Sequence, residues 1–293
     1  MKEKLIYALG FFDGVHLGHQ ALLAACRYLA KATGSTPCAV TFATHPDTLV
    51  TGNPPQLINT VLERQRLLLG HVRDILELPF DEKLRNQPWQ AFLEDLVARG
   101  AVGFVCGDDF RFGHRGQGNA KLLEQFCKER KLSLRVVPEQ LLDGVRVSST
   151  RIRRLLEQGE MAEAVRFLGH PHVFTGKVVP GRGLGHTLGI PTANMALPED
   201  VICPKHGVYA CKALVDGREY LAVTNIGNRP TVAGHHVTVE PWLLDFEGDL
   251  YGKTVTLQFY EFLRPEQKFP DLDSLKAEIL KNAAQTRKIL EKS

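Results

Sequence analysis

The sequence lacks any apolar stretch long enough to cross a membrane, and it lacks a long tract of charge of one sign. No uninterrupted apolar run approaches the roughly 20 residues of a membrane-spanning helix. The N-terminus, MKEKLIYALG, has too short an apolar part for a secretory signal. The formal net charge is only +3 over 293 residues. These absences argue against membrane insertion, export and nucleic-acid binding, and we expect a cytoplasmic protein.

Cysteine is also sparse, and no two cysteines form a C-x-x-C pair. All six are scattered, mostly inside apolar runs, so we expect reduced residues that pack in the interior. Cys203 and His206 stand at a spacing that could begin a zinc site. No second pair of ligands follows nearby, which disfavours zinc.

Strand and helix patterns alternate along the first half of the chain. Strands are predicted at residues 5–10, 37–43, 73–80, 101–107 and 132–137. Helices are predicted between them at residues 21–34, 60–70, 88–100 and 122–131, and two more follow at 148–159 and 161–169. This alternation predicts an α/β domain with a doubly wound parallel sheet, covered by helices on both faces.

The pattern changes around residues 169–171, where Gly and Pro become frequent. Antiparallel strands are predicted at residues 173–179, 207–215, 219–226, 237–246 and 254–263, and apolar residues at helical spacing fill residues 272–292. The second half therefore reads as an antiparallel β-barrel, or a sandwich, with a C-terminal helix. We place the domains at residues 1–168 and 169–293.

Two histidines, His16 and His19, fall where the first predicted strand leads into the first helix. In such a sheet, ligands bind beyond the carboxyl ends of the strands. Free N–H groups at a helix start bind phosphate, and imidazoles can donate hydrogen bonds to a phosphoryl oxygen. Asp13 and Gly14 would form the turn, and Gly18 would let a nucleotide approach the backbone. Alone, H-x-G-H is explained as well by a loop cap and an ordinary first-turn residue, but its position favours function.

A second stretch that indicates anion binding is VSSTRIRRLL at residues 147–156. Its hydroxyl residues suit a helix cap, and three arginines follow in the first turns against the preference of the helix dipole. A solvated basic helix explains this stretch taken alone. Together with the two histidines, it indicates a triphosphate.

The second half contains a glycine-rich stretch, TGKVVPGRGLGHTLGIPTAN, that is not a Walker P-loop. Gly181, Gly183 and Gly185 permit a close approach of the backbone to phosphate, although a glycine loop without a ligand fits the composition too. Thr192 and Asn194 alternate, so in an extended segment both point the same way. Their oxygens suit Mg²⁺.

These motifs together resemble the prokaryotic bifunctional riboflavin kinase/FMN adenylyltransferases, also called FAD synthetases. The first half carries H-x-G-H, CGDDFRFGHRGQG (106–118) and SSTRIR (148–153) in that order. The second half carries GIPTANM, GVYA, NIGNRPTV, VEPWLLDFEGDLYGK and FLRPEQKF. The resemblance covers nearly the whole chain. It implies phosphorylation of riboflavin to FMN in the second domain and adenylylation of FMN to FAD in the first, with ATP and Mg²⁺ in both.

For the first domain, the resemblance implies that His16 and His19 contact the ATP phosphates and the transition state. The leaving pyrophosphate would be bound by a single short segment, namely Ser148, Ser149, Thr150, Arg151 and Arg153. Asp109 would lie near the nucleotide or the flavin. Phe11 stands where relatives often have Asn, so no side-chain contact is expected from that position.

For the second domain, the resemblance implies that Thr192 and Asn194 bind MgATP and that Glu240 is the base for the ribityl hydroxyl. Thr238 and Trp242 share the strand face of Glu240. Without the resemblance, a lone strand glutamate would be read as solvated surface. The flavin would lie near Arg264, Lys268 and Phe269, and an acidic residue is expected near position 282, where this chain has Asn282.

Two other functions remain open on the sequence alone. The barrel could bind flavin without catalysis, which would leave a single-activity FMN adenylyltransferase. The first domain could also transfer a nucleotidyl group to another phosphorylated alcohol, because its motifs report nucleotide chemistry and not the acceptor. Thr192, Asn194 and Glu240 together favour the bifunctional reading.

Overall fold

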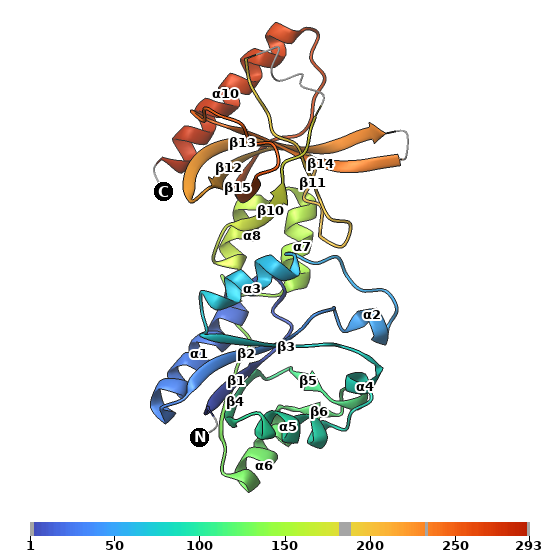
Figure 1. Ribbon diagram of the computed structural model, residues 1–293, viewed down its shortest axis with the longest axis vertical. Helices are drawn as coiled ribbons and strands as arrows, with labels where there is room; N and C mark the ends of the chain where they lie inside the picture. The colour runs from blue at the N-terminus through green and yellow to red at the C-terminus, as the bar shows by residue number, and fades with distance from the viewer. Residues whose placement is uncertain (1–2, 182–188, 232–233, 292–293) are drawn as a thin grey trace. The chain divides into compact units, whose positions relative to one another are not determined.

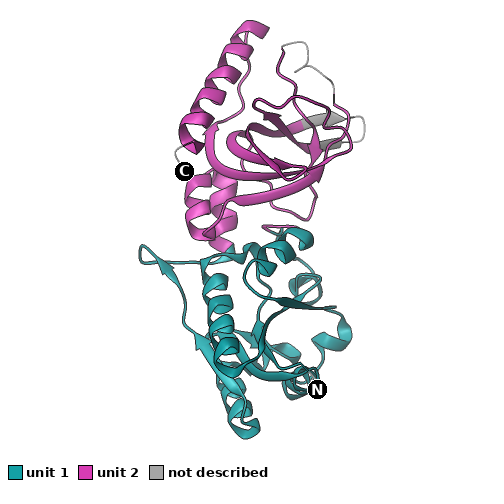
Figure 2. Cartoon of the chain, turned by 60° about the vertical axis from the view of Figure 1, so that its left-hand side comes forward, with its two compact units in different colours: residues 1–57, 61–149 teal, residues 58–60, 150–293 magenta. Residues whose placement is uncertain are grey.

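The computed structural model describes residues 3–181, 189–231 and 234–291. The chain divides into two compact units, residues 1–57 with 61–149 and residues 58–60 with 150–293 (Figure 2). The domain boundary expected after residue 168 therefore lies within the second unit as contacts define it. Among the described residues, no helix is both long and apolar enough to span a membrane.

The first unit is built on a five-stranded parallel sheet with the strand order β3-β2-β1-β4-β7 (Figure 1). The strands are β1 (Leu5–Leu9), β2 (Thr36–Phe42), β3 (Asp74–Leu78), β4 (Ala101–Gly107) and β7 (Ser133–Val137). All five predicted strands are confirmed to within a few residues. The strand order reverses direction between β1 and β4, so the carboxyl ends of these two strands form the topological switch point of the sheet.

Helices cover both faces of this sheet because β1 is apolar at every position. Leu5, Tyr7 and Leu9 pack with helices α5 and α6, whereas Ile6 and Ala8 pack with helices α1 and α3. The helices of this unit are α1 (Leu17–Thr33), α2 (Asp47–Val50), α3 (Val61–Leu69), α4 (Glu82–Arg85), α5 (Trp89–Ala98) and α6 (Ala120–Arg130). The prediction of a doubly wound α/β domain is confirmed.

Several short elements of this unit carry too little periodic signal to be predicted. They are α2, α4, the paired strands β5 (Arg111–Phe112) and β6 (Gly118–Asn119), and the paired strands β8 (Leu141–Leu142) and β9 (Val145–Arg146). Helix α1 begins at Leu17, four residues before the predicted start, because His16 supplies the N-cap.

The second unit begins with two helices and continues into a six-stranded antiparallel sheet with the order β10-β15-β12-β13-β14-β11. The helices are α7 (Ser149–Gln158) and α8 (Met161–Leu168). The strands are β10 (His172–Lys177), β11 (Met195–Ala196), β12 (Gly207–Val215), β13 (Arg218–Thr231), β14 (Gly234–Leu243) and β15 (Thr254–Arg264). A bridge between Val179 and Asn194 joins the chain after β10 to the chain before β11, so the sheet is nearly closed into a barrel.

Helix α10 (Leu272–Leu290) follows the barrel and confirms the predicted C-terminal helix. Asp271 caps it, accepting a hydrogen bond from the Ser274 N–H at 2.7 Å. Its Ala283 packs into an apolar cluster with Val208 of β12 and Val223 of β13. One side of this sheet is therefore covered by a helix.

All six cysteines are free thiols, and five of them are buried. Burial raises the pKa of the Cys26, Cys127 and Cys203 thiols to about 11. Thiols with such a pKa are unreactive packing residues, as the sequence predicts.

Candidate active sites

The turn that leads from β1 into α1 has an unusual backbone. Phe12, Gly14 and Val15 have φ values of 61°, 80° and 40°. A positive φ is ordinary for glycine but costs about 1–3 kcal/mol at the other two positions. The turn ends at His16, which takes the N-cap position of α1 at the switch point of the sheet.

The two histidines of this turn stack on each other. Their ring centroids lie 3.6 Å apart with an interplanar angle of 16°. The His16 Nδ1 accepts a hydrogen bond from the His19 backbone N–H at 3.3 Å, so the proton of a neutral His16 ring resides on Nε2. Burial lowers the pKa of His19 well below its ordinary value, and the neighbouring His16 and Arg64 lower it further. At neutral pH, His19 is an uncharged hydrogen-bond donor.

Gly18 has a role that the sequence does not reveal. A Cβ at this position would lie 3.1 Å from Cε1 and 3.2 Å from Nδ1 of His16. The absence of a side chain therefore gives room to the His16 ring.

One of the two serines predicted to bind phosphate, Ser149, contacts the same turn. The Ser149 hydroxyl donates a hydrogen bond to the Asp13 carbonyl at 3.0 Å. The Asp13 residue itself is 2 % exposed. The contact joins two motifs that are 136 positions apart in the sequence, and the predicted phosphate-binding role of Ser149 stays a prediction. Ser148 directly precedes α7.

The remaining residues of that motif lie on α7 in the second unit. Thr150, Arg151 and Arg153 occupy its first turns, and the Arg151 guanidinium lies over the Phe167 ring at 4.9 Å. These residues and the histidines belong to different units, and the phosphate-binding role of Thr150, Arg151 and Arg153 stays a prediction.

Asp109 follows β4, at the same edge of the sheet as the histidine turn. Its carboxylate is ion-paired with the Arg146 Nη2 at 2.6 Å, and the Arg146 Nε lies 3.1 Å from Glu139. Arg146 belongs to β9, so this pair connects the Asp109 loop to the β8–β9 hairpin.

A buried arginine that contacts the turn was not predicted from the sequence to have a role in the site. Arg64 of α3 has no exposed surface. Its Nη2 donates to the Phe42 carbonyl at 2.6 Å, and its guanidinium carbon lies 4.2 Å from the centre of the Phe11 ring. The sequence does hold one indication that Arg64 is unusual. It stands four positions before the buried Leu68, so it puts a charge on the apolar side of the helix.

In the second unit, strand register brings the predicted kinase residues together. Met195 pairs with Val239, and the Ala193 N–H donates to the Pro241 carbonyl at 2.9 Å. By the same register, Asn194 stands opposite Glu240. Residues opposite each other in an antiparallel pair share a face.

The neighbouring strand extends this row. Asn225 of β13 pairs with Glu240 on the other side. The Thr238 hydroxyl donates to the Glu240 Oε1 at 3.3 Å, which orients the carboxylate. The Asn225 amide donates to Glu266 at 3.4 Å. Asn225 has no predicted role, because only the register of β13 against β14 places it beside Glu240.

The predicted phosphate loop begins next to this row. A methyl group at Gly181 would overlap the Asn194 side-chain amide, so the two residues are in direct contact. Thr192 lies on the same segment and is half-buried. Gly183 and Gly185 lie outside the described residues. Among residues 3–181, 189–231 and 234–291, no group of three or more His, Cys, Asp and Glu side chains is arranged to hold a metal ion.

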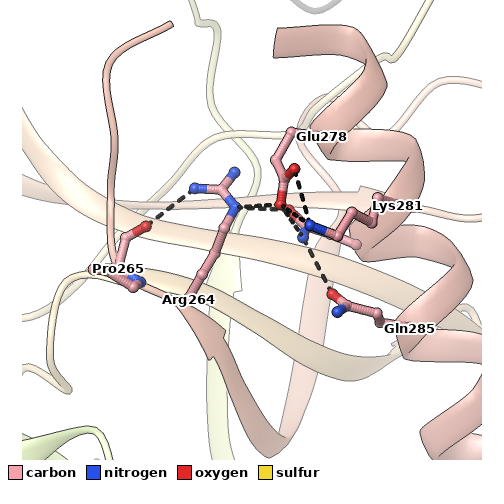
Figure 3. Close-up of polar contacts among 6 residues, drawn as sticks. Arg264, Pro265, Glu278, Lys281 and Gln285 are labelled. Carbon is pink, nitrogen blue, oxygen red and sulfur yellow. Dashed lines mark hydrogen bonds and ion pairs between the residues drawn. The ribbon is translucent and has the colours of Figure 1, made fainter. Parts of the chain in front are cut away.

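The predicted flavin residues stand at the end of β15 and directly after it, and Figure 3 shows the contacts of Arg264, the last residue of the strand. The Arg264 Nε donates to the Asn282 side-chain oxygen at 3.0 Å and lies 3.7 Å from Glu278, and both partners are on α10. Its guanidinium carbon also lies 5.6 Å from the centre of the Phe269 ring. Glu278 is an acidic residue one helical turn before Asn282, the position at which this chain departs from the acidic residue expected in relatives. Lys268 is exposed.

Comparisons with known proteins agree with this division into two sites. The FAD synthetase family matches residues 1–151, and the riboflavin kinase family matches residues 168–290. Residues 152–167 fall in neither match.

Three relatives carry the description "Bifunctional riboflavin kinase/FMN adenylyltransferase". The protein from Listeria monocytogenes is 34% identical over 96% of this chain and 91% of its own length. The proteins from Pseudomonas fluorescens and Escherichia coli K12 are 37% and 36% identical, over 96% and 98% of this chain and 92% and 93% of their own lengths.

A crystal structure of a protein from Streptococcus pneumoniae, described as a macrolide-efflux protein, shares the fold along nearly the whole chain. It matches with a TM-score of 0.89 and 29% identity, over 98% of this chain and 95% of that chain. With both family matches in this order and full-length relatives at this identity, the chain belongs to the bifunctional riboflavin kinase/FMN adenylyltransferase family.

Proposed function

We propose that the chain carries out two successive reactions with ATP. The barrel unit transfers the γ-phosphoryl group to riboflavin, which yields FMN and ADP. The α/β unit then transfers an adenylyl group to FMN, which yields FAD and pyrophosphate. We assign residues 1–168 to the second reaction and residues 169–293 to the first. A cytoplasmic location, expected from the sequence, is part of this proposal.

In the kinase site, Glu240 removes the proton from the ribityl 5′-hydroxyl as that oxygen attacks the γ-phosphorus in line. The observation that carries this assignment is the register that sets Asn194 directly opposite Glu240. Thr192 and Asn194 offer a hydroxyl and an amide oxygen, which fit Mg²⁺ together with phosphate oxygens and water. When bound, Mg²⁺ would neutralise phosphate charge. The loop that begins at Gly181 would cover the phosphates.

In the adenylyltransferase site, an FMN phosphate oxygen attacks the α-phosphorus of ATP and pyrophosphate leaves. His16 and His19 stand at the start of a 17-residue helix, where backbone N–H groups attract phosphate. As hydrogen-bond donors, they stabilise the charge that develops on the phosphoryl oxygens. Ser148, Ser149, Thr150, Arg151 and Arg153 would hold the pyrophosphate, and Asp109 would lie toward the nucleotide or flavin.

The flavin of the kinase reaction would lie toward Arg264 and Phe269. Support for this placement comes from the stacking of these two side chains and from their attachment to α10 through Asn282 and Glu278. Lys268, exposed on the same loop, would meet the substrate from solvent.

The test is to incubate the purified protein with riboflavin and MgATP and to follow FMN, FAD, ADP and pyrophosphate over time. We expect FMN to appear first, with ADP, and FAD to follow, with pyrophosphate. FAD formed only from added FMN would support the alternative in which the barrel binds flavin without catalysis. The absence of any flavin product would contradict both.

A further inference from the structure

Arg64 is a buried cation whose hydrogen-bonding capacity is largely unused. The side chain has no exposed surface, and its Nη2 donates to the Phe42 carbonyl. Its Nε and Nη1 are buried without an acceptor in the part of the chain that the structure describes. A buried charge with unused donors costs several kcal/mol. The loss of folding free energy at Arg64 therefore suggests that this residue contributes to function.

The contacts of Arg64 lead directly to the histidine turn. Its guanidinium stacks on Phe11, the residue that precedes the positive-φ segment. The carboxylates that act on its charge are those of Asp13, which is buried within the turn, and Glu77 of β3. Arg64 therefore connects α3 to the turn in two ways, by its contact with the Phe11 ring and by its electrostatic interaction with Asp13.

The same charge acts on the histidine pair. His19 packs its ring against Phe12 at 5.3 Å and stacks on His16 at 3.6 Å. The charged or titratable groups that act on its imidazole are His16, at the helix start, and Arg64, on the neighbouring helix. Both oppose a proton on His19, and burial opposes it too.

We propose that Arg64 is a positioning residue for adenylyl transfer: it braces the turn at residues 11–13 and keeps a fixed positive charge beside the histidine pair, so that His19 acts as a neutral donor. This inference rests on the proposed role of His19. It adds a residue on α3 to a site that otherwise consists of the β1–α1 turn and Ser149.

The experiment compares three full-length variants in both reactions. Arg64→Met removes the charge and keeps an apolar stem, and Arg64→Lys keeps the charge but loses the planar stacking on Phe11. Arg66→Met is the matched control, because it removes an exposed arginine from the same helix. Riboflavin kinase activity, which resides in the other unit, is the internal standard for enzyme concentration.

We expect Arg64→Met to lower kcat for FMN adenylylation by about 10-fold to 100-fold, since small displacements of catalytic groups cost this much. The acid limb of its pH profile should move to higher pH, because the His19 ring then takes up a proton more readily. Arg64→Lys should keep the pH profile of the unaltered protein with a reduced rate. Arg66→Met should change neither.

The His19 Cε1 resonance of carbon-13 labelled protein, assigned by its loss in His19→Gln, gives an independent readout of the titration. A reduced rate in Arg64→Met with an unchanged pH profile and unchanged His19 titration would show a merely structural role and overturn the inference. If Arg64→Met unfolds the first unit, Arg64→Lys decides, because an altered pH profile with the charge retained also overturns it. Full adenylylation by His19→Ala would instead reject the proposed role of His19, on which the inference rests, while leaving FMN adenylylation itself in place.

Discussion

The two sites of this chain are built on opposite principles. In the first unit, the site depends on a helix N-terminus and backbone strain: a turn with three positive φ values brings two histidines to the start of α1. In the second unit, it depends on strand register, which aligns Asn194, Glu240 and Asn225 across three neighbouring strands. Helix starts present N–H donors to phosphate, whereas sheet faces present side chains at fixed intervals.

This difference separates the chemistry as well. In the proposed function, the α/β site offers hydrogen-bond donors that would stabilise charge on a phosphoryl group without taking a proton. The barrel site offers a carboxylate that is oriented by a hydroxyl and can accept a proton. A reaction that needs a base for an alcohol belongs in the barrel. A displacement by an FMN phosphate oxygen, which needs no base, belongs at the helix start.

The largest expected effect is that of Glu240→Gln on riboflavin phosphorylation. Loss of a general base typically costs about 10²–10⁴ in rate. ADP formation from riboflavin and MgATP should fall by this factor, and pyrophosphate formation from added FMN should stay as it is. The amide keeps the size of the side chain and the hydrogen bond from Thr238, so the strand register is preserved. Equal losses in both reactions would contradict independent sites.

The mirror experiment is His19→Ala. Removal of one donor from a preorganised charge-stabilising site costs about 10²–10³ in kcat. FAD formation from FMN should fall by this factor, and riboflavin phosphorylation should be unaffected. Both rates are measured on the same preparation by separating the flavins. A variant that still makes FAD at the normal rate would remove the histidine pair from the mechanism.

Two glycines sharpen the comparison at a smaller scale. Gly181→Ala should push the Asn194 amide out of place and raise the KM for MgATP in the kinase reaction about 10-fold. Gly18→Ala should press on the His16 ring and lower adenylylation by a similar factor. Each change should be silent in the other reaction. The two pairs of KM and kcat values, measured in parallel, show whether each glycine serves the side chain that it contacts.

A last prediction concerns stability in acid and leaves both activities at neutral pH unchanged. His172 of β10 is 2 % exposed beside Phe259, and burial lowers its pKa to about 3. The folded state therefore keeps His172 neutral below the ordinary pKa of about 6.5, while the unfolded state takes up a proton. Stability is unaffected at pH 7 and falls as the pH decreases, by about 2 kcal/mol at pH 5.

The variant His172→Phe should lack this loss. Urea unfolding at pH 7 and at pH 5 measures it as a gain of the variant over the unaltered protein that is present only at the lower pH. The half-buried neighbour His170, changed to Gln, is the control. The same gain in both variants would show that the effect is not specific to the buried ring.

Sequence periodicity was sufficient to predict the parallel sheet of the first unit and the barrel of the second. The alternation of strands and helices predicts the parallel sheet, and the change of texture near residue 169 predicts the barrel, because both patterns are local. It failed where elements are short, as in α2, α4 and the β5–β6 and β8–β9 pairs. It also ended β13 at residue 226, because the Gly-Asn-Arg-Pro that follows reads as a turn, whereas the strand continues to Thr231.

By itself, the sequence determined which residue types stand at each functional position: histidines and a glycine at a helix start, hydroxyls before a basic helix, and a glutamate on a strand. Only the tertiary structure decided which of them meet. The contact of Ser149 with Asp13, the alignment of Asn194 with Glu240, and the burial of Arg64 beneath Phe11 all join segments that are distant in the chain. Such contacts depend on how strands pair and helices pack, and no local pattern of residues encodes that choice.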